Sequence, residues 1–339
     1  MKEAPYILAI ESSCDDTAAA VLQGPKVLSN CIANQEIHKQ YGGVVPELAS
    51  RAHQSNIVPV IQQALLQANI DKKQIAAIAY TQGPGLLGSL LVGGSFAKSL
   101  ALAWEVPLLE IDHMQGHLLV HFIEGVHPTP PAFPFIGVTL SGGHTQIVWV
   151  EDYFNMTVIG STLDDAIGEA FDKCGKLLGL PYPAGPHIDR LAQTGNPDRF
   201  LLPKPKVGEL DVSYSGIKTG FMNFLNQQTQ RNKNFIAENL EDLCASLQKA
   251  LVAIIMDKIT LAVALKKNNR IAIGGGVAAN SGLRNALKAQ QEQKDWQTFL
   301  PPFAYTTDNA AMIGIAGYYK FCLEDFGLMS TSSNARLKF

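Results

Sequence analysis

The sequence predicts an α/β fold of two lobes related by internal duplication, with a ligand bound in the cleft between them. Three observations predict it. The 339 residues of the chain exceed the roughly 100 to 200 residues that one hydrophobic core usually organises. Two strand-loop-strand segments lie far apart, at residues 6–22 and 135–150. The 29 Gly and 18 Pro residues are typical of a chain with many tight turns between strands and helices.

The two strand-loop-strand segments carry different loops. In the first, strands over residues 6–10 and 18–22 flank the acidic, hydroxyl-rich stretch Glu11-Ser-Ser-Cys-Asp-Asp-Thr17. In the second, strands over residues 135–140 and 146–150 flank the glycine-rich stretch Ser141-Gly-Gly-His-Thr145. Because a strand-loop-strand segment can open an α/β lobe, we interpret the pair as the start of each duplicated half.

The elements between and after these segments follow from periodicity and turn residues. We expect a helix over residues 46–67 that Pro59 kinks or interrupts. Further strands are predicted at 75–80, 108–111 and 271–273, and further helices at 86–104, 162–178, 236–265 and from Asn280 onward. The predicted lobes are residues 1–112 with 301–328, and residues 113–300. Residues 329–339 are predicted to be a flexible tail.

Composition excludes several classes of protein. Hydrophobic residues make up 47% of the chain and charged residues 17%, which is typical of globular proteins. The net charge of -3 gives no overall attraction to nucleic acid, so RNA binding would need a partner or a local patch. The candidate patch consists of Lys204, Lys206, Lys218, Arg231 and Lys233.

Cysteine usage and hydropathy indicate the compartment. The five cysteines are scattered and form no C-x-x-C pair, which argues against a disulfide framework and favours a reducing environment. The apolar run Tyr6–Ile10 is too short for a signal peptide. No stretch is expected to reach the roughly 18 apolar residues of a membrane span. We therefore expect a cytoplasmic protein with no membrane partner.

The segment His113-Met-Gln-Gly-His117 is a candidate metal site. On a helix, the i,i+4 spacing puts both imidazoles on one face, where they can share a metal ion. In H-E-x-x-H peptidases a glutamate in this segment activates the metal-bound water. Met114 and Gln115 cannot accept that proton, which weakens a peptidase interpretation without excluding a carboxylate from elsewhere. Two histidines with one carboxylate would favour a catalytic iron or zinc site.

Glycine loops form the second candidate site. Ser141–Thr145 and Gly274–Gly276 each follow a predicted strand, and their backbone N–H groups could hold phosphate oxygens. Asp172, on the polar face of its predicted helix, could accept ribose hydroxyls. Asp308 precedes another predicted helix, so N-capping and metal ligation are competing roles for its carboxylate.

Taken together, these motifs resemble the bacterial tRNA N6-adenosine threonylcarbamoyltransferase family, formerly labelled O-sialoglycoprotein endopeptidases. The resemblance rests on Glu11–Thr17, His113–His117, Ser141–Thr145, Gly274–Asn280 and Thr307–Asn309, and covers the chain from about Tyr6 to Tyr319. The sequence departs from the family pattern at two positions. Gln115 stands where glutamate is common, and Ala184 replaces the first glycine of a Gly-Gly-Pro turn.

The resemblance implies a duplicated actin/hexokinase/Hsp70-like fold, also described as RNase H-like, with the active site in the cleft between the lobes. It implies that His113, His117 and Asp308 hold one Fe2+ per subunit, with Zn2+ as the alternative, and that Asp308 reaches the histidines across the cleft. Glu11 is a candidate catalytic residue that would face the same cleft. An adenine nucleotide, as part of threonylcarbamoyl-adenylate, would contact Thr139, Leu140, Ser141, Gly142, Gly143, Asp172, Gly185, Asp189 and Asn280.

The implied reaction transfers the threonylcarbamoyl group from threonylcarbamoyl-AMP to N6 of adenosine 37 in tRNAs that read codons beginning with adenine. The implied partners are tRNA, a smaller TsaB-like paralogue of the same fold as heterodimer partner, and a TsaE-like P-loop ATPase. The main alternative is a small-molecule kinase of the same superfamily, which would use magnesium and would not need the histidines. A metallopeptidase and a non-catalytic scaffold are weaker alternatives.

Overall fold

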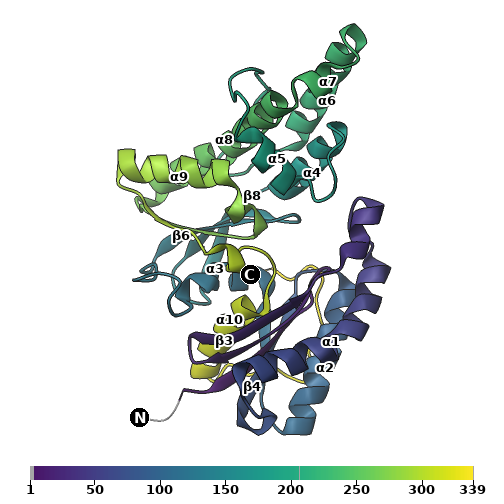
Figure 1. Cartoon of the computed structure of the whole chain (residues 1–339). Helices are drawn as coiled ribbons and strands as arrows, with labels where there is room; N and C mark the ends of the chain where they lie inside the picture. Colours follow the sequence, from purple (N-terminus) through teal and green to yellow (C-terminus); the bar gives the residue numbers. More distant parts are fainter. Residues whose placement is uncertain (1–3, 206, 339) are drawn as a thin grey trace. The chain divides into compact units, whose positions relative to one another are not determined.

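The computed structural model describes residues 4–205 and 207–338 (Figure 1). The chain forms two compact units, Met1–Pro131 with Pro301–Phe339 and Ala132–Leu300. Residues 113–131 belong to the first unit, so the boundary differs from the predicted one at residue 112. The reason is that the short helix that starts at His113 packs against the C-terminal helix of the first unit.

The first unit is built on a five-stranded mixed sheet of order β3-β2-β1-β4-β5. Strands β1, β2 and β3 form an antiparallel meander, and β4 and β5 lie parallel to β1. The predicted first hairpin is confirmed, and each predicted strand is present with slightly longer bounds. The strands are Tyr6–Glu11, Thr17–Gln23, Lys26–Ala33, Ile75–Gly83 and Leu108–Asp112, numbered β1 to β5.

Helices cover both faces of this sheet (Figure 1). Helices α1 (Pro46–Ala68) and α2 (Leu87–Trp104) pack over the face that carries Leu8, Ile78 and Tyr80. Helix α10 (Ala310–Cys322) packs on the other face, where a Cβ on Gly317 would lie 2.7 Å from Ala79 Cβ. The remaining elements are α3 and the 3-10 turns η1, η2, η3 and η5, at His113–Leu119, Glu36–Tyr41, Lys72–Gln74, Val120–Phe122 and Phe303–Tyr305.

The second unit repeats the sheet of the first, with order β8-β7-β6-β9-β10. Strands β6, β7 and β8 are antiparallel, and β9 and β10 continue the sheet parallel to β6. The same strand order and directions in both units confirm the predicted duplicated α/β fold. The strands are Phe135–Leu140, Thr145–Val150, Met156–Ser161, Arg270–Gly274 and Gln297–Phe299, numbered β6 to β10.

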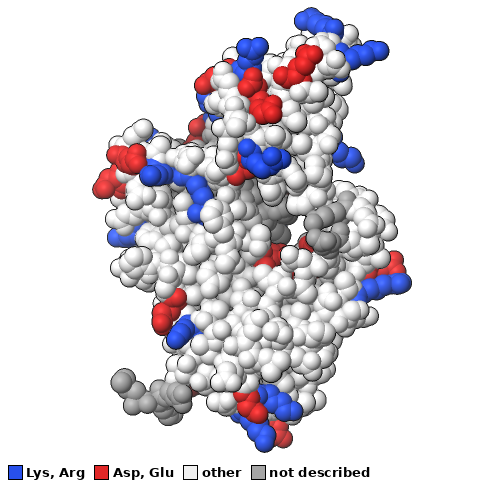
Figure 2. Space-filling model, viewed as in Figure 1, with Lys and Arg blue, Asp and Glu red and all other residues white. Residues whose placement is uncertain are grey.

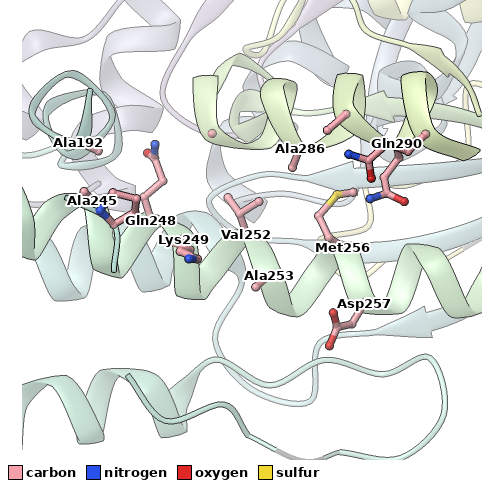
Figure 3. A pocket seen from close by; sticks show the side chains of 14 residues that line it. Ala192, Ala245, Gln248, Lys249, Val252, Ala253, Met256, Asp257, Ala286 and Gln290 are labelled. Carbon is pink, nitrogen blue, oxygen red and sulfur yellow. The ribbon is translucent and has the colours of Figure 1, made fainter. Parts of the chain in front are cut away.

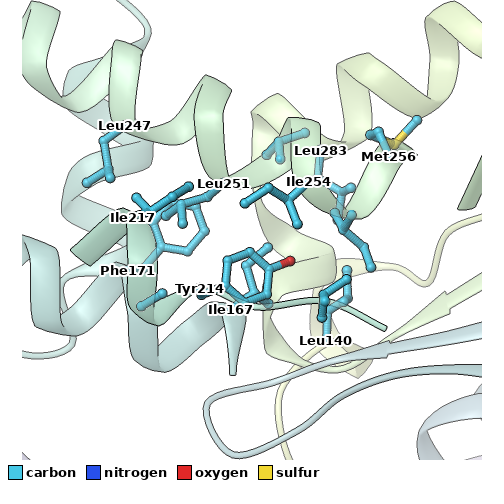
Figure 4. Packing of buried hydrophobic residues seen from close by; sticks show 14 of the residues in the cluster. Leu140, Ile167, Phe171, Tyr214, Ile217, Leu247, Leu251, Ile254, Met256 and Leu283 are labelled. Carbon is cyan, nitrogen blue, oxygen red and sulfur yellow. The ribbon is translucent and has the colours of Figure 1, made fainter. Parts of the chain in front are cut away.

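Helices of the second unit enclose a large apolar core (Figure 4). Phe171, Ile217 and Leu251 meet there with Leu140 at the end of β6. Burial of side chains of this size contributes about 1.5 to 3 kcal/mol each, so this core anchors the loops that follow the strands. The helices are Ile167–Leu177, Gly185–Ala192, Ser215–Arg231, Phe235–Glu238, Leu240–Lys266 and Ser281–Lys294, numbered α4 to α9, with the 3-10 turn η4 at Gly276–Ala279.

Three helix predictions needed correction. Helix α1 is continuous through Pro59, so the predicted interruption does not occur, although a proline there cannot donate the usual backbone hydrogen bond; the predicted kink stays a prediction. The helix predicted from residue 162 begins only at Ile167, because Thr162 and Asp164 make loop contacts instead. The long helix predicted over 236–265 is divided into α7 and α8 at Asn239.

Helix α2 is long and apolar enough to cross a membrane by length and composition alone, which the sequence analysis did not expect. Its glycine, serine and alanine residues lower its hydropathy only slightly while they permit close packing. One third of the 18-residue window is buried in the structure, where the helix packs on β4 and α1.

The C-terminal segment, predicted as a flexible tail, makes specific contacts within the first unit. The Asn334 N–H donates to Gln82 O at 2.9 Å, and the Ser333 hydroxyl donates to Leu90 O at 3.2 Å. The Lys98 ammonium donates to Thr331 O. The described part of this segment therefore lies against β4 and α2.

Candidate functional site

Helix α3 fixes the two histidines of the predicted metal site. Asp112, the last residue of β5, caps the helix by accepting hydrogen bonds from the N–H groups of Met114 at 2.7 Å and Gln115 at 3.1 Å. The helix therefore begins at His113, and His117 lies one turn later. Both imidazoles are buried, with ring centroids 4.7 Å apart and planes nearly perpendicular.

Close packing of α3 on α10 brings Asp308 to these histidines. A Cβ on Gly116 would lie 3.3 Å from both Ile313 Cδ1 and Met312 O, so glycine permits the observed approach. The helix α10 begins just after Asp308 and is capped by Asn309, whose side chain accepts from Met312 N–H at 3.1 Å. Asn309 thus takes the capping role, and the Asp308 carboxylate is left to face the histidines.

The three side chains converge as a metal donor set. Asp308 Oδ1 lies 3.4 Å from His113 Nε2 and 3.2 Å from His117 Nε2. Within the described residues, both ring nitrogens of His117 are buried without a hydrogen bond. All three donor atoms lie within 4.8 Å of one another. Two imidazoles and a carboxylate suit a divalent transition metal with open coordination positions.

All three candidate ligands belong to the first unit. The expectation that Asp308 would join the histidines from across a cleft is therefore wrong. The reason is that α10 packs on the sheet of the first unit, beside α3.

Glu11, the candidate catalytic residue, lies behind His113 at the end of β1. Its side chain is fully buried, and its Oε2 atom lies 3.1 Å from His113 Nδ1. Oε2 also accepts from the Thr81 hydroxyl at 2.5 Å, and Oε1 accepts from the Ser13 N–H at 2.5 Å. Thr81 was not predicted; its only signal was its place at a strand end, before a glycine-rich turn.

Electrostatics separate the two histidines. Burial lowers the pKa of His113, but Glu11 and Asp308 outweigh it and raise the pKa well above the usual histidine range. Burial and the neighbouring His113 leave the pKa of His117 lowered, although Asp308 opposes this. Burial alone would raise the pKa of Asp308, but the histidines hold it well below its usual value. The net result is an ionised Asp308 carboxylate beside a protonated His113 and a neutral His117. A bound metal ion would displace the proton on His113 Nε2.

The glycine loops of the second unit lie side by side. Strands β6 and β9 are parallel neighbours with Thr139 opposite Gly274, so both loops leave the same edge of the sheet. Gly275 adopts a φ of 90°, and a Cβ there would collide with Leu140 O. By contrast, nothing lies within 4 Å of a Cβ placed on Gly142, Gly143 or Gly276. The loops therefore pack tightly where they meet and leave open backbone elsewhere.

Helix N-termini surround these loops. The N–H of Gly168, in the first turn of α4, donates to Ser141 O at 3.2 Å. Helix α9 begins at Ser281, directly after Asn280 at the end of the second loop. Exposed glycine backbone beside the N-terminus of α4 carries partial positive charge that attracts phosphate, whereas the Asp189 carboxylate already accepts from the Ser281 N–H at the N-terminus of α9.

Several predicted binding residues of the second unit have structural duties. The Asp172 carboxylate accepts from Ala184 N–H at 2.7 Å and so holds the turn before Gly185. The Asp189 carboxylate accepts from the Ser281 hydroxyl at 2.6 Å. Asn280 caps α9 by accepting from Leu283 N–H at 3.0 Å. Thr139 and Leu140 are fully buried within β6.

A groove of about 600 Å³ lies between α8 and α9 (Figure 3). Its lining includes Gln248, which accepts from Asn280 Nδ2 at 2.7 Å, and small residues of both helices. The charged side chains Lys249 and Asp257 in its lining form ion pairs with residues outside it. None of the predicted site residues lines the groove, and it brings together no group of titratable side chains.

The candidate basic patch is weaker than the sequence indicated. Lys204 forms an ion pair with Asp257, and Lys218 lies 3.6 Å from an Asp165 carboxylate oxygen. Lys206 lies outside the described residues. Figure 2 shows Lys and Arg side chains interspersed with Asp and Glu around α6 and α7, near the top of the view.

The chain is similar over nearly its whole length to known proteins of one family. The family model for tRNA N6-adenosine threonylcarbamoyltransferase matches residues 26–315. Proteins of that name from Christiangramia forsetii and Riemerella anatipestifer are 59% and 54% identical to this chain. The first match covers 98% of both chains, and the second covers 97% of both.

Among solved structures, full-length HypF matches with a TM-score of 0.61 at 14% identity, over 98% of this chain and 48% of HypF. Component A of the (R)-2-hydroxyglutaryl-CoA dehydratase from Acidaminococcus fermentans matches with a TM-score of 0.55 at 15% identity, over 94% of this chain and all of that one. At these identities the likeness concerns the fold alone. The family match and the high-identity relatives establish that this chain belongs to the tRNA N6-adenosine threonylcarbamoyltransferase family.

Proposed function

We propose that this chain transfers the threonylcarbamoyl group of threonylcarbamoyl-AMP to N6 of adenosine 37, beside the anticodon, in tRNAs that read codons beginning with adenine. The observation that carries the proposal is the 59% identity, over 98% of both chains, to a relative named for threonylcarbamoyl transfer to tRNA adenosine. This favours the transferase over the kinase and peptidase alternatives.

His113, His117 and Asp308 would hold one metal ion, Fe2+ in preference to Zn2+. The support is the convergence of two Nε2 atoms on one carboxylate oxygen, 3.4 and 3.2 Å away. When bound, such an ion supplies Lewis acidity toward an oxygen of the substrate. No carboxylate lies between the histidines in sequence, and Glu11 is already occupied by hydrogen bonds. These features weaken a peptidase interpretation, and the sequence identity to a named transferase decides against it.

The glycine loops of the second unit would bind the adenylate. Gly142 and Gly143 are exposed, and the N-terminus of α4, beside Ser141, adds positive potential for the phosphate. In the reaction, N6 of adenosine attacks the carbamoyl carbon, the bond from that carbon to the adenylate oxygen breaks, and AMP leaves with that electron pair. The proton lost from N6 passes to the released phosphate or to water. Positioning must supply much of the rate enhancement, because the amine lone pair is delocalised into the purine.

The proposed partners are tRNA, a smaller TsaB-like paralogue as heterodimer partner, and a TsaE-like P-loop ATPase, in the cytoplasm. The net charge of -3 and the paired lysines favour tRNA binding that is shared with a partner. Helices α1 and α2 offer an apolar surface for the paralogue. Its exposed side chains are Val58, Leu66, Leu87, Leu91 and Leu102.

The test is transfer of labelled threonine from purified threonylcarbamoyl-AMP to tRNA, with the partner proteins added. We expect incorporation by the wild type and its loss in His113→Ala and Asp308→Ala. The control is Asp325→Ala, which removes an exposed aspartate of the same unit that pairs with Lys320, and which should keep full activity. Absence of incorporation by the wild type, together with phosphorylation of a small molecule from ATP, would overturn the proposal and favour the kinase.

A further inference from the structure

Glu11 is placed to act on the metal site and not on the substrate. It is the last residue of β1, its side chain is fully buried, and three donors already surround its two oxygens. Three of the roughly four acceptor positions of this buried carboxylate are therefore occupied by groups of the protein. Its shortest route to the chemistry runs through His113 Nδ1, 3.1 Å away.

We propose that Glu11 is a positioning residue that holds His113 with its proton on Nδ1, so that the Nε2 lone pair faces Asp308 and the metal. This inference rests on the proposed metal-dependent function. In protein metal sites, a ligating histidine commonly donates its second ring N–H to a carboxylate, which fixes the tautomer and the ring orientation. Here, His113 Nδ1 lies 3.1 Å from Glu11 Oε2 and 3.2 Å from the Ser13 hydroxyl, while Nε2 lies 3.4 Å from Asp308 Oδ1. Of the two groups at Nδ1, the Glu11 carboxylate is the charged acceptor.

Two neighbouring residues hold the Glu11 carboxylate in place. Thr81, on the adjacent strand β4, donates its hydroxyl to Oε2, the same oxygen that faces His113. The Ser13 N–H donates to Oε1. Because Glu11 and Thr81 lie on paired central strands, the support for His113 is rigid.

The geometry makes Glu11→Gln a sharp test, because an amide offers one acceptor and one donor group. If the amide oxygen accepts from Ser13 N–H, its NH2 group faces Thr81 and His113 Nδ1. It then favours the tautomer that carries the proton on Nε2, which cannot bind metal. If the amide is flipped, its NH2 group opposes the Ser13 N–H. Either arrangement loses one contact that the carboxylate satisfies.

The experiment measures Zn2+ affinity of the full chain by competition with a chromophoric chelator. We expect Glu11→Gln to bind Zn2+ about 10- to 100-fold more weakly than the wild type, the range typical when a partner of a metal-ligating histidine is lost. Thr81→Val, which keeps the carboxylate but removes one support, should show a smaller loss. The control Glu110→Gln, which neutralises a carboxylate that accepts from Leu328 N–H, should bind Zn2+ like the wild type.

A second readout is spectroscopic. In the zinc-loaded wild type, the His113 Nδ1–H should give a downfield, slowly exchanging proton signal, because it is hydrogen-bonded to a buried carboxylate. In Glu11→Gln this signal should move upfield or vanish by exchange. If Glu11→Gln does not fold, as judged by circular dichroism, Thr81→Val serves as the test instead. Reduced Zn2+ affinity and a shifted Nδ1–H signal in Thr81→Val would then support the positioning role, and wild-type values of both would overturn it.

The outcomes separate this inference from the proposed function. The positioning role would be overturned if Glu11→Gln keeps the wild-type Zn2+ affinity and an unchanged Nδ1–H signal. It would also be overturned if Glu11→Gln loses turnover with unchanged Zn2+ affinity, because that result would assign Glu11 directly to the reaction. The metal-dependent function itself would instead be rejected if the wild type does not bind Zn2+, or if His117→Ala binds Zn2+ as well as the wild type does.

Discussion

Gly116 determines how closely helix α3, which carries His113 and His117, approaches helix α10, which follows Asp308. A larger side chain at position 116 should therefore weaken metal binding. A Cβ at this position would lie 3.3 Å from Ile313 Cδ1, 3.3 Å from Met312 O and 3.4 Å from Met312 Cγ. These distances are tight but tolerable for one methyl group. Alanine also gains up to about 1 kcal/mol of helix propensity over glycine. We therefore expect Gly116→Ala to change the free energy of unfolding little.

Gly116→Val adds two more methyl groups where three atoms already stand at contact distance. Overpacking of this kind costs about 1 to 3 kcal/mol, which corresponds to a fall in Tm of very roughly 2 to 10 °C for a chain of this size. The strain is relieved if α3 moves away from α10, and that movement separates the histidines from Asp308. Because metal sites tolerate errors of only about 0.2 Å in ligand distances, we expect Zn2+ affinity to fall at least tenfold.

The assay compares wild type, Gly116→Ala and Gly116→Val by thermal unfolding without metal and by Zn2+ competition titration. Alanine is the matched control, since it adds the Cβ without the branch. The reasoning is refuted if the valine variant keeps wild-type Zn2+ affinity, whatever its Tm. The contact between α3 and α10 would then not be what sets the distance between the histidines and Asp308.

Three further predictions concern local structure. Asn309→Ala should lower stability by about 1 kcal/mol through loss of the cap and leave Zn2+ binding unchanged. Asp308→Asn should lose Zn2+ binding without a comparable loss of Tm. Equal effects of the two variants on both Tm and Zn2+ binding would contradict this division of roles. Gly275→Ala should destabilise the chain by at least about 2 kcal/mol, since the φ of 90° at this position is strained for alanine and the added Cβ meets Leu140 O. The same variant should weaken AMP binding measured by calorimetry. A Tm equal to that of the wild type would contradict the predicted destabilisation. Asp164→Ala should lower stability by about 1 to 2 kcal/mol at neutral pH. Burial raises the pKa of Asp164, but hydrogen bonds from Ser213, Ser215 and Tyr214 outweigh burial and lower the pKa to about 2. The stabilisation by Asp164 is therefore complete above pH 4 and is lost as the pH falls toward 2. Urea titrations should show a smaller stability difference between wild type and variant at pH 2.5 than at pH 7, and an equal difference at both pH values would contradict the prediction.

The sequence was sufficient for seven of the ten described strands, but not for β3, β8 and β10, and for the helix that carries both candidate metal-binding histidines. Strands such as Tyr6–Ile10 and Phe135–Leu140 are short apolar runs between turn residues, and this pattern needs no tertiary information. The spacing of His113 and His117 fixes their common face as soon as a helix forms. What spacing could not decide was whether Asp308 or its neighbour Asn309 caps α10, because both residue types are good caps and only the packed structure distinguishes them.

Other features depended on contacts that are distant in sequence. Thr81 lies 70 residues from Glu11, and only the pairing of β1 with β4 brings them together. The segment at 162–166 has helical periodicity, but Asp164 forms hydrogen bonds near the start of α6, about 50 residues away, and these hold it as a loop. The C-terminal segment is polar and was predicted to be flexible, yet its backbone meets partners on β4 and α2.

The duplication explains why two such different sites arise in equivalent places. In each unit the candidate site lies at the carboxyl ends of the central parallel strands, the edge where ligands of α/β sheets usually bind. In the first unit, β1 ends at Glu11, β4 ends two residues after Thr81, and β5 ends at the residue before His113. The side chains of these three residues therefore converge at one edge of the sheet. In the second, β6 and β9 end at Leu140 and Gly274, and glycines expose backbone instead. Converging candidate metal-ligating side chains and exposed glycine backbone are therefore two outcomes of one scaffold, and the residues that follow each strand decide between them.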